Sequence, residues 1–538
     1  MSDKAPILKL PSEITFIILA FLSVPDVLAF RQVCKNFDFI TRDRGFWLER
    51  VRLHQATLPL PINARDEASL LSLSTKHVEE IAISSLKSEY SWLSKRSSSL
   101  QLNGILEARD ILHLGFLLDK LVLCVYSQGT ILLWDLRRGA TMGKVPLAFW
   151  ELWGREPWTS AFACADVSED AVYVAVTRAQ NRSQQGSTTV LMRIPLPEHD
   201  SGDDALHPSL LDNQFNDLDT LFGGNDQIVR TLDPSRHLVA FSRSPFIDVV
   251  HWPSNTGISI DTQREELDQL WNGIIGLHFI DSHLLCVKAR SLELYHITVP
   301  LPSFSSYFVP SSLGLVQTTQ STAPSPRSST AAIRPVAMHF FSTTTFRGAS
   351  FSSPSTAPPA LLNTTSVCIL AHDVLRGVFH YQVDVTTASE PSPGPGVPPS
   401  LRVELIGIHD MAYGIPGFVS TAALGPQSRR GVWIERMKNT TTRRVMAFST
   451  AAGKGATDAS DEVDAPAPQV EESAAQDEAG LDEDEDDEVP RMVGTPIKAR
   501  TIYESSSYDL RDDLLHMAFS EVTGRIALGT RSGEIRII

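Results

Sequence analysis

Few side chains in this sequence have the types and spacing that catalysis needs. The chain has no G-x-S-x-G motif, no Walker-type phosphate loop, no H-E-x-x-H motif and no dinucleotide-binding glycine fingerprint. His113 and His516 lie at equivalent positions of two similar segments, each three residues before a phenylalanine, and we expect both to be structural. Cys34 is expected to be a small packed side chain rather than a nucleophile. The sequence predicts no enzyme and no cofactor.

Negative charge is concentrated in one segment of the chain. The net charge is −16, and residues 456–490 hold fifteen carboxylates with no lysine or arginine, so the other residues are close to neutral. The chain therefore lacks the basic footprint of a nucleic-acid-binding protein. We interpret this acidic tract as a solvated loop, with binding of a basic partner or of weakly held divalent cations as the alternative.

The cysteine pattern and the hydropathy indicate a reducing compartment. The five cysteines lie far apart and form no C-x-x-C pair, which argues against a disulfide framework or a zinc site. No stretch reaches 18 apolar residues, so we expect no transmembrane helix. The apolar run 14–24 lacks a signal-peptide cleavage site. We expect a cytoplasmic or nuclear protein without a membrane partner.

Two segments carry aromatic and basic side chains of the kind that dominate protein interfaces. The candidate substrate-binding residues are Trp150, Trp153, Arg155, Trp158, Arg429 and Arg430. The last two begin a basic cluster that continues with Arg436, Lys438, Arg443 and Arg444. A fourth strand with a packing loop is the alternative for the tryptophans. A solvated face, or a site for a phosphorylated or acidic peptide, are the alternatives for the basic cluster.

The first fifty residues predict three or four short helices. Leu10-Pro11-Ser12-Glu13 has the proline and the acid that favour a helix start, and the apolar residues from Ile14 to Leu22 follow at helical spacing. Pro25-Asp26 begins a second helix, and further apolar runs follow at 33–40 and 46–54. Such a small unit has little core of its own, so much of its apolar surface needs a partner.

This N-terminal segment resembles an F-box, whose family pattern is L-P-x-E, an apolar helix, P-x-D-L, V-C-(K/R) and a late tryptophan. The matching residues are Pro11, Glu13, Leu22, Asp26, Val33, Cys34, Lys35 and Trp47. Val27 stands where the family usually has leucine, and Phe37 where many members have tryptophan. The resemblance covers about residues 8–54.

The F-box resemblance implies docking of a few apolar anchors onto the Skp-type adaptor of a cullin–RING ubiquitin ligase. The adaptor-binding residues that it suggests are Leu10, Pro11, Ile14, Ile18, Leu22, Pro25, Leu28, Val33, Cys34 and Trp47.

From about residue 100 the apolar pattern changes to the period of strands. Residues 111–135 and 514–538 share one plan of strand, turn, strand, turn and strand, and weaker copies lie between them. These triplets, with Trp134-Asp135 as one complete dipeptide, resemble a WD-repeat β-propeller of about seven blades. The chain stops at the third strand of its last blade, so residues 100–103 are predicted to supply the fourth and close the ring. A sandwich or a pair of smaller β domains is the alternative.

The predicted organisation is α+β multidomain, with a small all-α F-box followed by an all-β propeller. The expected parts are an F-box domain at 5–54, a helical linker at 55–98 and the propeller at 99–538. Disordered insertions are expected at 310–332, 349–360, 386–400 and, inside the final blade, the acidic tract at 456–490.

This organisation indicates a substrate-recognition subunit of an SCF-type ubiquitin ligase. The box would bind the adaptor, and a loop-bearing face of the propeller would bind a protein substrate. A scaffold that binds the adaptor but ubiquitinates nothing is the alternative. A propeller enzyme is a third class, for which the sequence offers no recognisable acid and base.

Overall fold

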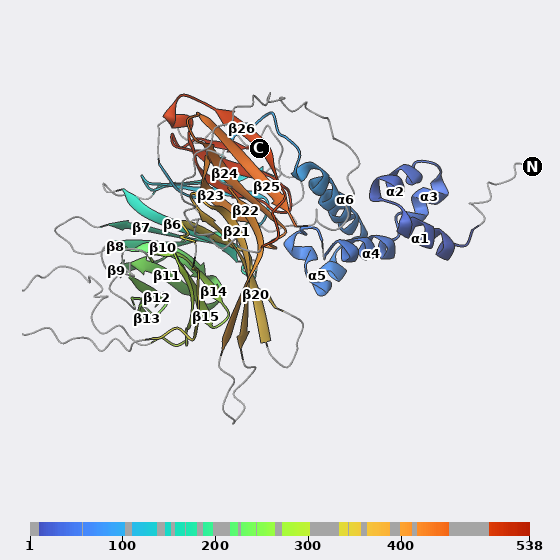
Figure 1. Ribbon diagram of the computed structural model, residues 1–538. Helices are drawn as coiled ribbons and strands as arrows, with labels where there is room; N and C mark the ends of the chain where they lie inside the picture. The colour runs from blue at the N-terminus through green and yellow to red at the C-terminus, as the bar shows by residue number, and fades with distance from the viewer. Residues whose placement is uncertain are drawn as a thin grey trace, which may run out of the picture.

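The computed structural model has a helical part at the N-terminus and a large body of strands (Figure 1). Within residues 10–538 it leaves out 56, 103–109, 137–145, 152–156, 167, 180–186, 197–215, 224–226, 244, 255, 264–271, 302–332, 343, 357–362, 388–398, 412–416 and 451–493. The description below concerns the other residues of that range.

The helical part consists of six α-helices. Their bounds are α1 (Ser12–Phe21), α2 (Val24–Arg31), α3 (Lys35–Ile40), α4 (Arg44–Gln55), α5 (Glu67–Ser72) and α6 (Thr75–Trp92). The start of α2 is capped by the Ser23 hydroxyl, which accepts from the Asp26 N–H, and Ser74 caps α6 in the same way. One core joins these helices, with the fully buried Leu19, Trp47 and Val78 from α1, α4 and α6.

The strands form seven sheets, each with four strands in antiparallel order, and the fifth has one extra short strand. The first three are β2 (Ile111–Leu117), β3 (Leu121–Tyr126), β4 (Thr130–Asp135), β5 (Ala148–Glu151); β6 (Trp158–Asp166), β7 (Ala171–Ala179), β8 (Ser187–Pro195), β9 (Asn216–Gly223); and β10 (Ile228–Asp233), β11 (Leu238–Arg243), β12 (Phe246–His251), β13 (Thr256–Asp261).

The other four sheets follow in chain order. They are β14 (Ile274–Ile280), β15 (His283–Lys288), β16 (Ser291–His296), β17 (Ala337–Phe340); β18 (Gly348–Phe351), β19 (Ser355–Thr356), β20 (Asn363–Asp373), β21 (Gly377–Thr387), β22 (Ser400–Asp410); β23 (Gly417–Leu424), β24 (Arg430–Met437), β25 (Thr442–Ser449), β26 (Ala499–Ser506); and β27 (Leu514–Phe519), β28 (Ile526–Thr530), β29 (Ile535–Ile537), β1 (Leu100–Leu102).

These sheets are the blades of a closed seven-bladed propeller. The first strands contact one another in the cyclic order β2, β6, β10, β14, β18, β23, β27 and back to β2. The predicted fold class is therefore confirmed, and the sandwich alternative is excluded. The predicted closure is also confirmed, because β1 pairs antiparallel with β29 and sets Leu100 opposite Ile537.

Two expectations about the insertions are corrected by the strand assignments. The segment 349–360 is not an unstructured insertion throughout, because Gly348–Phe351 is β18 and Ser355–Thr356 is β19, both paired with β20. The acidic tract 456–490 follows β25 and precedes β26, so it belongs to the sixth blade rather than the final one. The tract itself and 310–332 lie outside the described residues, as does most of 386–400.

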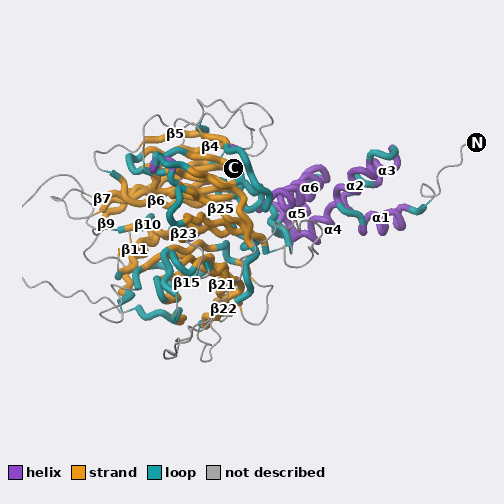
Figure 2. Tube along the Cα trace, turned by 45° about the horizontal axis from the view of Figure 1, so that its top comes forward, coloured by secondary structure: helices purple, strands orange, loops and turns teal. Residues whose placement is uncertain are grey.

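The two ends of the propeller differ in what they contact. At one end, the turns 425–429 and 520–524 contact the helical part; we call this end the linker face. There the Arg96 guanidinium donates to the Gly524 carbonyl at 2.7 Å, and Gln427 exchanges two hydrogen bonds with the backbone of Leu60. At the other end, the free face, the loop 507–513 lies beside the turn 531–534. Figure 2 shows the helices attached at one side of the strand body.

Candidate functional site

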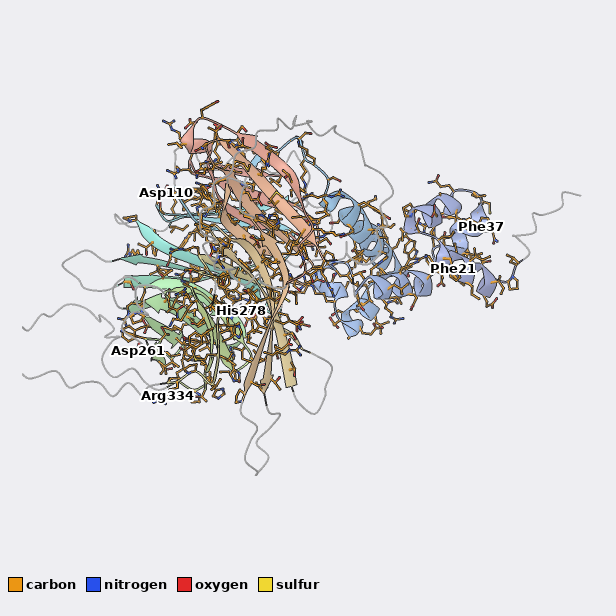
Figure 3. All side chains as sticks on the ribbon, viewed as in Figure 1. Phe21, Phe37, Asp110, Asp261, His278 and Arg334 are labelled. Atoms are coloured by element: carbon orange, nitrogen blue, oxygen red, sulfur yellow. The ribbon has the colours of Figure 1, made fainter. Side chains whose placement is uncertain are left out.

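The α1 helix carries the most exposed apolar residues of the described helical part. Ile14, Ile17, Ile18 and Phe21 are 43, 57, 37 and 86% exposed, and their spacing puts them on one side of α1. Val33 and Phe39 add exposures of 68 and 80%. We call these six residues the apolar surface. Figure 3 shows Phe21 at the outer end of the helical part, away from the propeller.

The opposite side of α1 fixes the helix in place. Leu19 is fully buried in the helical core, and the Arg50 guanidinium of α4 donates to the Leu19 carbonyl at 2.6 Å and to the Leu22 carbonyl. This cation adds a second donor to the Leu19 carbonyl, which also accepts from the Leu22 N–H, and its charge is favourable at the C-terminal end of α1. Because α1 is held from behind, its apolar side is presented to solvent in a fixed orientation.

The predicted adaptor-binding residues divide by exposure. Leu10, Pro11, Ile14, Ile18, Pro25 and Val33 are exposed, whereas Leu22, Leu28 and Cys34 are half-buried. Trp47 is a correction, because it is fully buried and its indole N–H donates to the Thr41 carbonyl at 2.8 Å. Trp47 therefore supports the helices from within and contacts no partner.

Three residues of the apolar surface were absent from the predicted adaptor-binding set. Ile17 and Phe21 continue the spacing of Ile14 and Ile18, so the helical periodicity was a sufficient signal for them. Phe39 lies on α3, two residues from the buried Phe37 and therefore on the other side of the helix. Phe37 stacks on Phe30 with a centroid distance of 3.8 Å. Only the packing of α3 decides which of these two phenylalanines is exposed.

Arg430, predicted to bind substrate, is instead part of the joint between α6 and the propeller. Its side chain is fully buried. The guanidinium donates to Glu89 at 2.6 Å, to the Ser88 hydroxyl at 2.7 Å and to the Glu521 carbonyl at 2.7 Å. It also lies over the Trp92 ring, 4.9 Å from the centroid. The assignment of Arg430 to a substrate site is therefore wrong.

The Glu521 carboxylate shapes the turn beside this joint. It accepts from the backbone N–H groups of Gln427, Arg429 and Arg430 at 2.6, 2.6 and 3.0 Å. A Cβ atom at position 425 would approach the Glu521 carboxyl carbon to 2.3 Å, so only glycine fits there. The turn that carries Arg429 and begins β24 is thus fixed by a buried carboxylate.

Of the other predicted substrate-binding residues, Trp150 and Trp158 do not form one site with Arg429 and Arg430. Trp150 is half-buried on β5, and Trp158 is 2% exposed in the core between the first two blades, with the Arg178 guanidinium over its ring. Trp150 therefore lies on the fourth strand of its blade, as the structural alternative predicts, whereas Trp158 begins the first strand of the next blade. Trp153 and Arg155 lie outside the described residues.

Strand direction separates Trp158 from the two arginines. Trp158 begins a first strand and Arg430 a second strand, and antiparallel neighbours begin at opposite ends of a blade. Trp158 therefore lies toward the free face, and Arg429 and Arg430 lie at the linker face.

The predicted basic cluster is divided along β24 and β25. Arg436 and Arg443 both pair with the buried Asp513 carboxylate, at 3.0 and 2.8 Å, and Arg444 lies 3.9 Å from Glu504. Lys438 is exposed. These cations lie toward the free face, one strand length from Arg429 and Arg430, so the cluster is not a single anion site.

The repeated histidines have the structural role that the sequence predicts. His113 and His516 lie on the neighbouring first strands β2 and β27. Burial, and to a lesser extent the charge of His516, lowers the pKa of His113 to about 4, and burial also lowers the pKa of His516. Both rings are therefore neutral near pH 7.

Neither a metal cluster nor a membrane-spanning helix occurs in the described part of the chain. No group of three or more histidine, cysteine, aspartate or glutamate side chains is placed there to hold a metal ion. Among these residues no helix is long and apolar enough to cross a bilayer.

The helices and blades define a class of protein that joins a small helical adaptor-type domain to a β-propeller. Residues 7–52 match the family model described as F-box-like. The chain thus has an F-box-like domain followed by a seven-bladed propeller, the architecture of an F-box protein that acts through protein interactions and typical of non-enzymatic adaptor proteins. F-box domains generally bind Skp-type adaptors.

Known structures resemble the chain only in its general architecture. The WD40 domain of SCAP from fission yeast has 8% identity and a TM-score of 0.39, covering 80% of this chain and 95% of that one. Raptor from Chaetomium thermophilum has 8% identity and a TM-score of 0.41, covering 98% and 40%. Hsv2 from Kluyveromyces lactis has 8% identity and a TM-score of 0.34, covering 79% and 91%. A search of the curated proteins finds no match.

Proposed function

We propose that this protein is the substrate-recognition subunit of an SCF-type cullin–RING ubiquitin ligase. The F-box-like helices bind the Skp-type adaptor, and the propeller holds a protein substrate near the ubiquitin-charged enzyme. The protein contributes no reacting group. Its contribution is a raised effective concentration of substrate lysines.

The observation that carries this proposal is the apolar surface on α1, on α3 and on the turn between α2 and α3. Six large apolar side chains stay exposed within a segment of under thirty residues, whereas soluble proteins seldom expose contiguous apolar patches unless they bind a partner. The surface lies on helices, which suits an interface between helices with a few anchors, and Phe21 is the most exposed of them.

The joint at the linker face supports the same function. Arg430, Trp92 and Arg96 fasten α6 to the sixth and seventh blades through buried contacts, and the Trp92 indole donates to the Phe448 carbonyl at 2.9 Å. A buried joint transmits the orientation of the adaptor to the propeller. Delivery by proximity requires such a fixed spacing.

We place the substrate on the free face of the propeller. The loop 507–513 there presents Tyr508 and Leu510 with exposures of 95 and 68%, next to the arginines that surround Asp513. Aromatic and arginine side chains dominate the energy of protein interfaces. The replacement Tyr508→Ser with Leu510→Ser is expected to lose client proteins while the adaptor still co-purifies.

The deciding experiment is reconstitution with a Skp-type adaptor. The variant Ile17→Asp with Phe21→Asp is expected to abolish co-purification of the adaptor, because two charges would be buried at the interface. Leu375→Asp is the matched control, since Leu375 is 74% exposed on a propeller turn. Full adaptor binding by the double variant would overturn the proposal.

Affinity purification separates the ligase subunit from a scaffold. A ligase subunit is expected to retain the cullin and ubiquitinated clients, both lost in the Phe21→Asp variant. Recovery of the adaptor alone would instead indicate a scaffold that ubiquitinates nothing.

We also propose that the protein works in the cytoplasm or the nucleus. All five cysteines are free thiols, as a reducing compartment favours. Fluorescence microscopy of the tagged full chain tests this, and a secreted or luminal signal would contradict it.

A further inference from the structure

A polar cavity of about 410 Å³ lies where the helical part meets the linker face. Gln55, Leu60 and Arg65 form the wall on the helical side. The propeller side is formed by Ser352, Ser353, Pro354, Ser355, Ser366, Cys368, Gln382, Pro426, Gln427, Ser428 and Arg429. The cavity is distinct from the apolar surface on α1 and from the free face.

The charged side chains among the described residues that line the cavity are all positive. Among the described residues that line the cavity there are two arginines, five serines and three glutamines, but no aspartate or glutamate. Burial raises the pKa of the Cys368 thiol, so this group is neutral near pH 7. The lining therefore carries two positive charges, hydroxyl groups and amides, and only three apolar side chains.

The carboxylates around these walls are Glu521, Asp384 and Asp119, and all three accept hydrogen bonds from the protein. The Arg65 charge acts on Glu521 and on Asp119, and Asp119 accepts from the Ser520 hydroxyl at 3.0 Å. Glu521 accepts from three backbone N–H groups of the 427–430 turn. Asp384 accepts from the Ser366 hydroxyl at 2.6 Å and from the Gln382 amide at 3.0 Å. Their hydrogen-bonding capacity is directed to the protein, so the guanidinium groups of Arg65 and Arg429 set the character of the cavity.

Hydrogen bonds between the walls hold the cavity in shape. The Ser353 N–H donates to the Pro426 carbonyl at 2.8 Å, and Cys368 N–H donates to the Ser352 hydroxyl at 2.8 Å. Gln427 is bonded to Leu60 in both directions, at 3.0 and 2.8 Å. The extra strand β19 begins at Ser355 and is present only in the fifth blade among the described sheets. A preformed cavity of this size is within the range of small-molecule sites.

We propose that this cavity binds a small polyol phosphate, whose phosphate group is held by Arg65 and Arg429 and whose hydroxyls meet the serine side chains. Arginine binds phosphate through paired hydrogen bonds from its planar fork. Because one arginine belongs to the helical part and the other to the propeller, the ligand contacts both and stiffens the joint. This site is independent of the proposed ligase function.

The test is isothermal titration of the full chain with glucose 6-phosphate, with glucose and inorganic phosphate as partial ligands. Glucose 6-phosphate is expected to bind more tightly than either one. Arg429→Gln is expected to weaken this binding about tenfold or more, since a charged partner is lost. Arg511→Gln, a change to an exposed arginine on the free face, is the matched control and should leave the affinity unchanged.

Other readouts keep the proposal falsifiable. Arg429→Lys keeps the charge and should recover part of the affinity, and ligand should slow proteolytic cleavage in 55–66. Absence of binding at millimolar glucose 6-phosphate, or equal affinity in Arg429→Gln, would overturn the proposal. Binding of a phosphoserine peptide without glucose 6-phosphate would assign the cavity to a protein side chain and also overturn it. Adaptor co-purification is not affected by any of these outcomes.

Discussion

Every residue of β3 and β4 is buried, whereas Ile14, Ile17, Ile18 and Phe21 of α1 are all more than a third exposed. The propeller covers the apolar residues of these inner strands itself, because each blade packs against two neighbours and β1 closes the ring. The F-box-like helices are too short to do so. The strands of the propeller need no partner to bury these residues, whereas the F-box-like helices require a partner surface.

A substitution at the joint between the helical part and the propeller should give the largest loss of stability. Arg430→Glu places a buried carboxylate beside Glu89, and loss of one partner from a buried ion pair typically costs about 3–5 kcal/mol. We expect a destabilised joint, measured by thermal unfolding and by cleavage of the linker. Arg429→Gln is the control for the same turn. An unchanged melting profile would mean that the joint does not couple the two regions.

Substitutions at Trp47 and Phe21 should have different effects, because Trp47 lies in the core of the helical part and Phe21 lies on its surface. Trp47→Ala removes a fully buried ring and is expected to destabilise the helices by about 3 kcal/mol. Phe21→Ala should leave helical circular dichroism unchanged and weaken only adaptor binding. Equal losses of helix in both variants would contradict the assignment of Phe21 to a free surface.

Buried histidines of the propeller should make the free energy of unfolding depend on pH. Burial lowers the pKa of His372 and of His380 to about 4, below the value near 6.5 expected in the unfolded chain. Between these values the unfolded state binds more protons, so stability is full above pH 6.5 and falls as the pH drops toward 4. The slope is about 1.4 kcal/mol per pH unit for each histidine.

Denaturant unfolding of the full chain at pH 7.5 and pH 5 measures this slope. His380→Phe should reduce it, because phenylalanine does not titrate. If the slope were the same in His380→Phe, this histidine would not be a source of the acid sensitivity.

Deletion of the acidic tract should have the smallest effect. Its composition favours solvated chain, so removal of 456–490 is expected to change the free energy of unfolding by less than about 0.5 kcal/mol. Differential scanning calorimetry of the deletion variant against the full chain measures this. A fall of many degrees in Tm would show that the tract packs on one of the two regions.

Local patterns in the sequence predicted the N-terminal helices, the repeated blades and the closure of the ring, but not β18 and β19, which fall in a segment expected to be disordered. The spacing of Ile14, Ile17, Ile18 and Phe21 indicates one apolar side of a helix, because a helix repeats every 3.6 residues. The missing fourth strand of the last blade and the alternation at 100–103 predict the pairing with β29, because an unpaired edge must be covered.

Only the tertiary structure decided which aromatic and arginine side chains are exposed to a partner. Trp47, Trp158 and Arg430 have the residue types of interface anchors, yet each is buried by the packing of other helices or strands. Arg430 meets Glu89 across 341 residues, and Arg65 and Arg429 share one cavity. Residue type and spacing fix what a side chain can do. Its exposure depends on how distant helices and blades pack against it, and no local pattern carries that information.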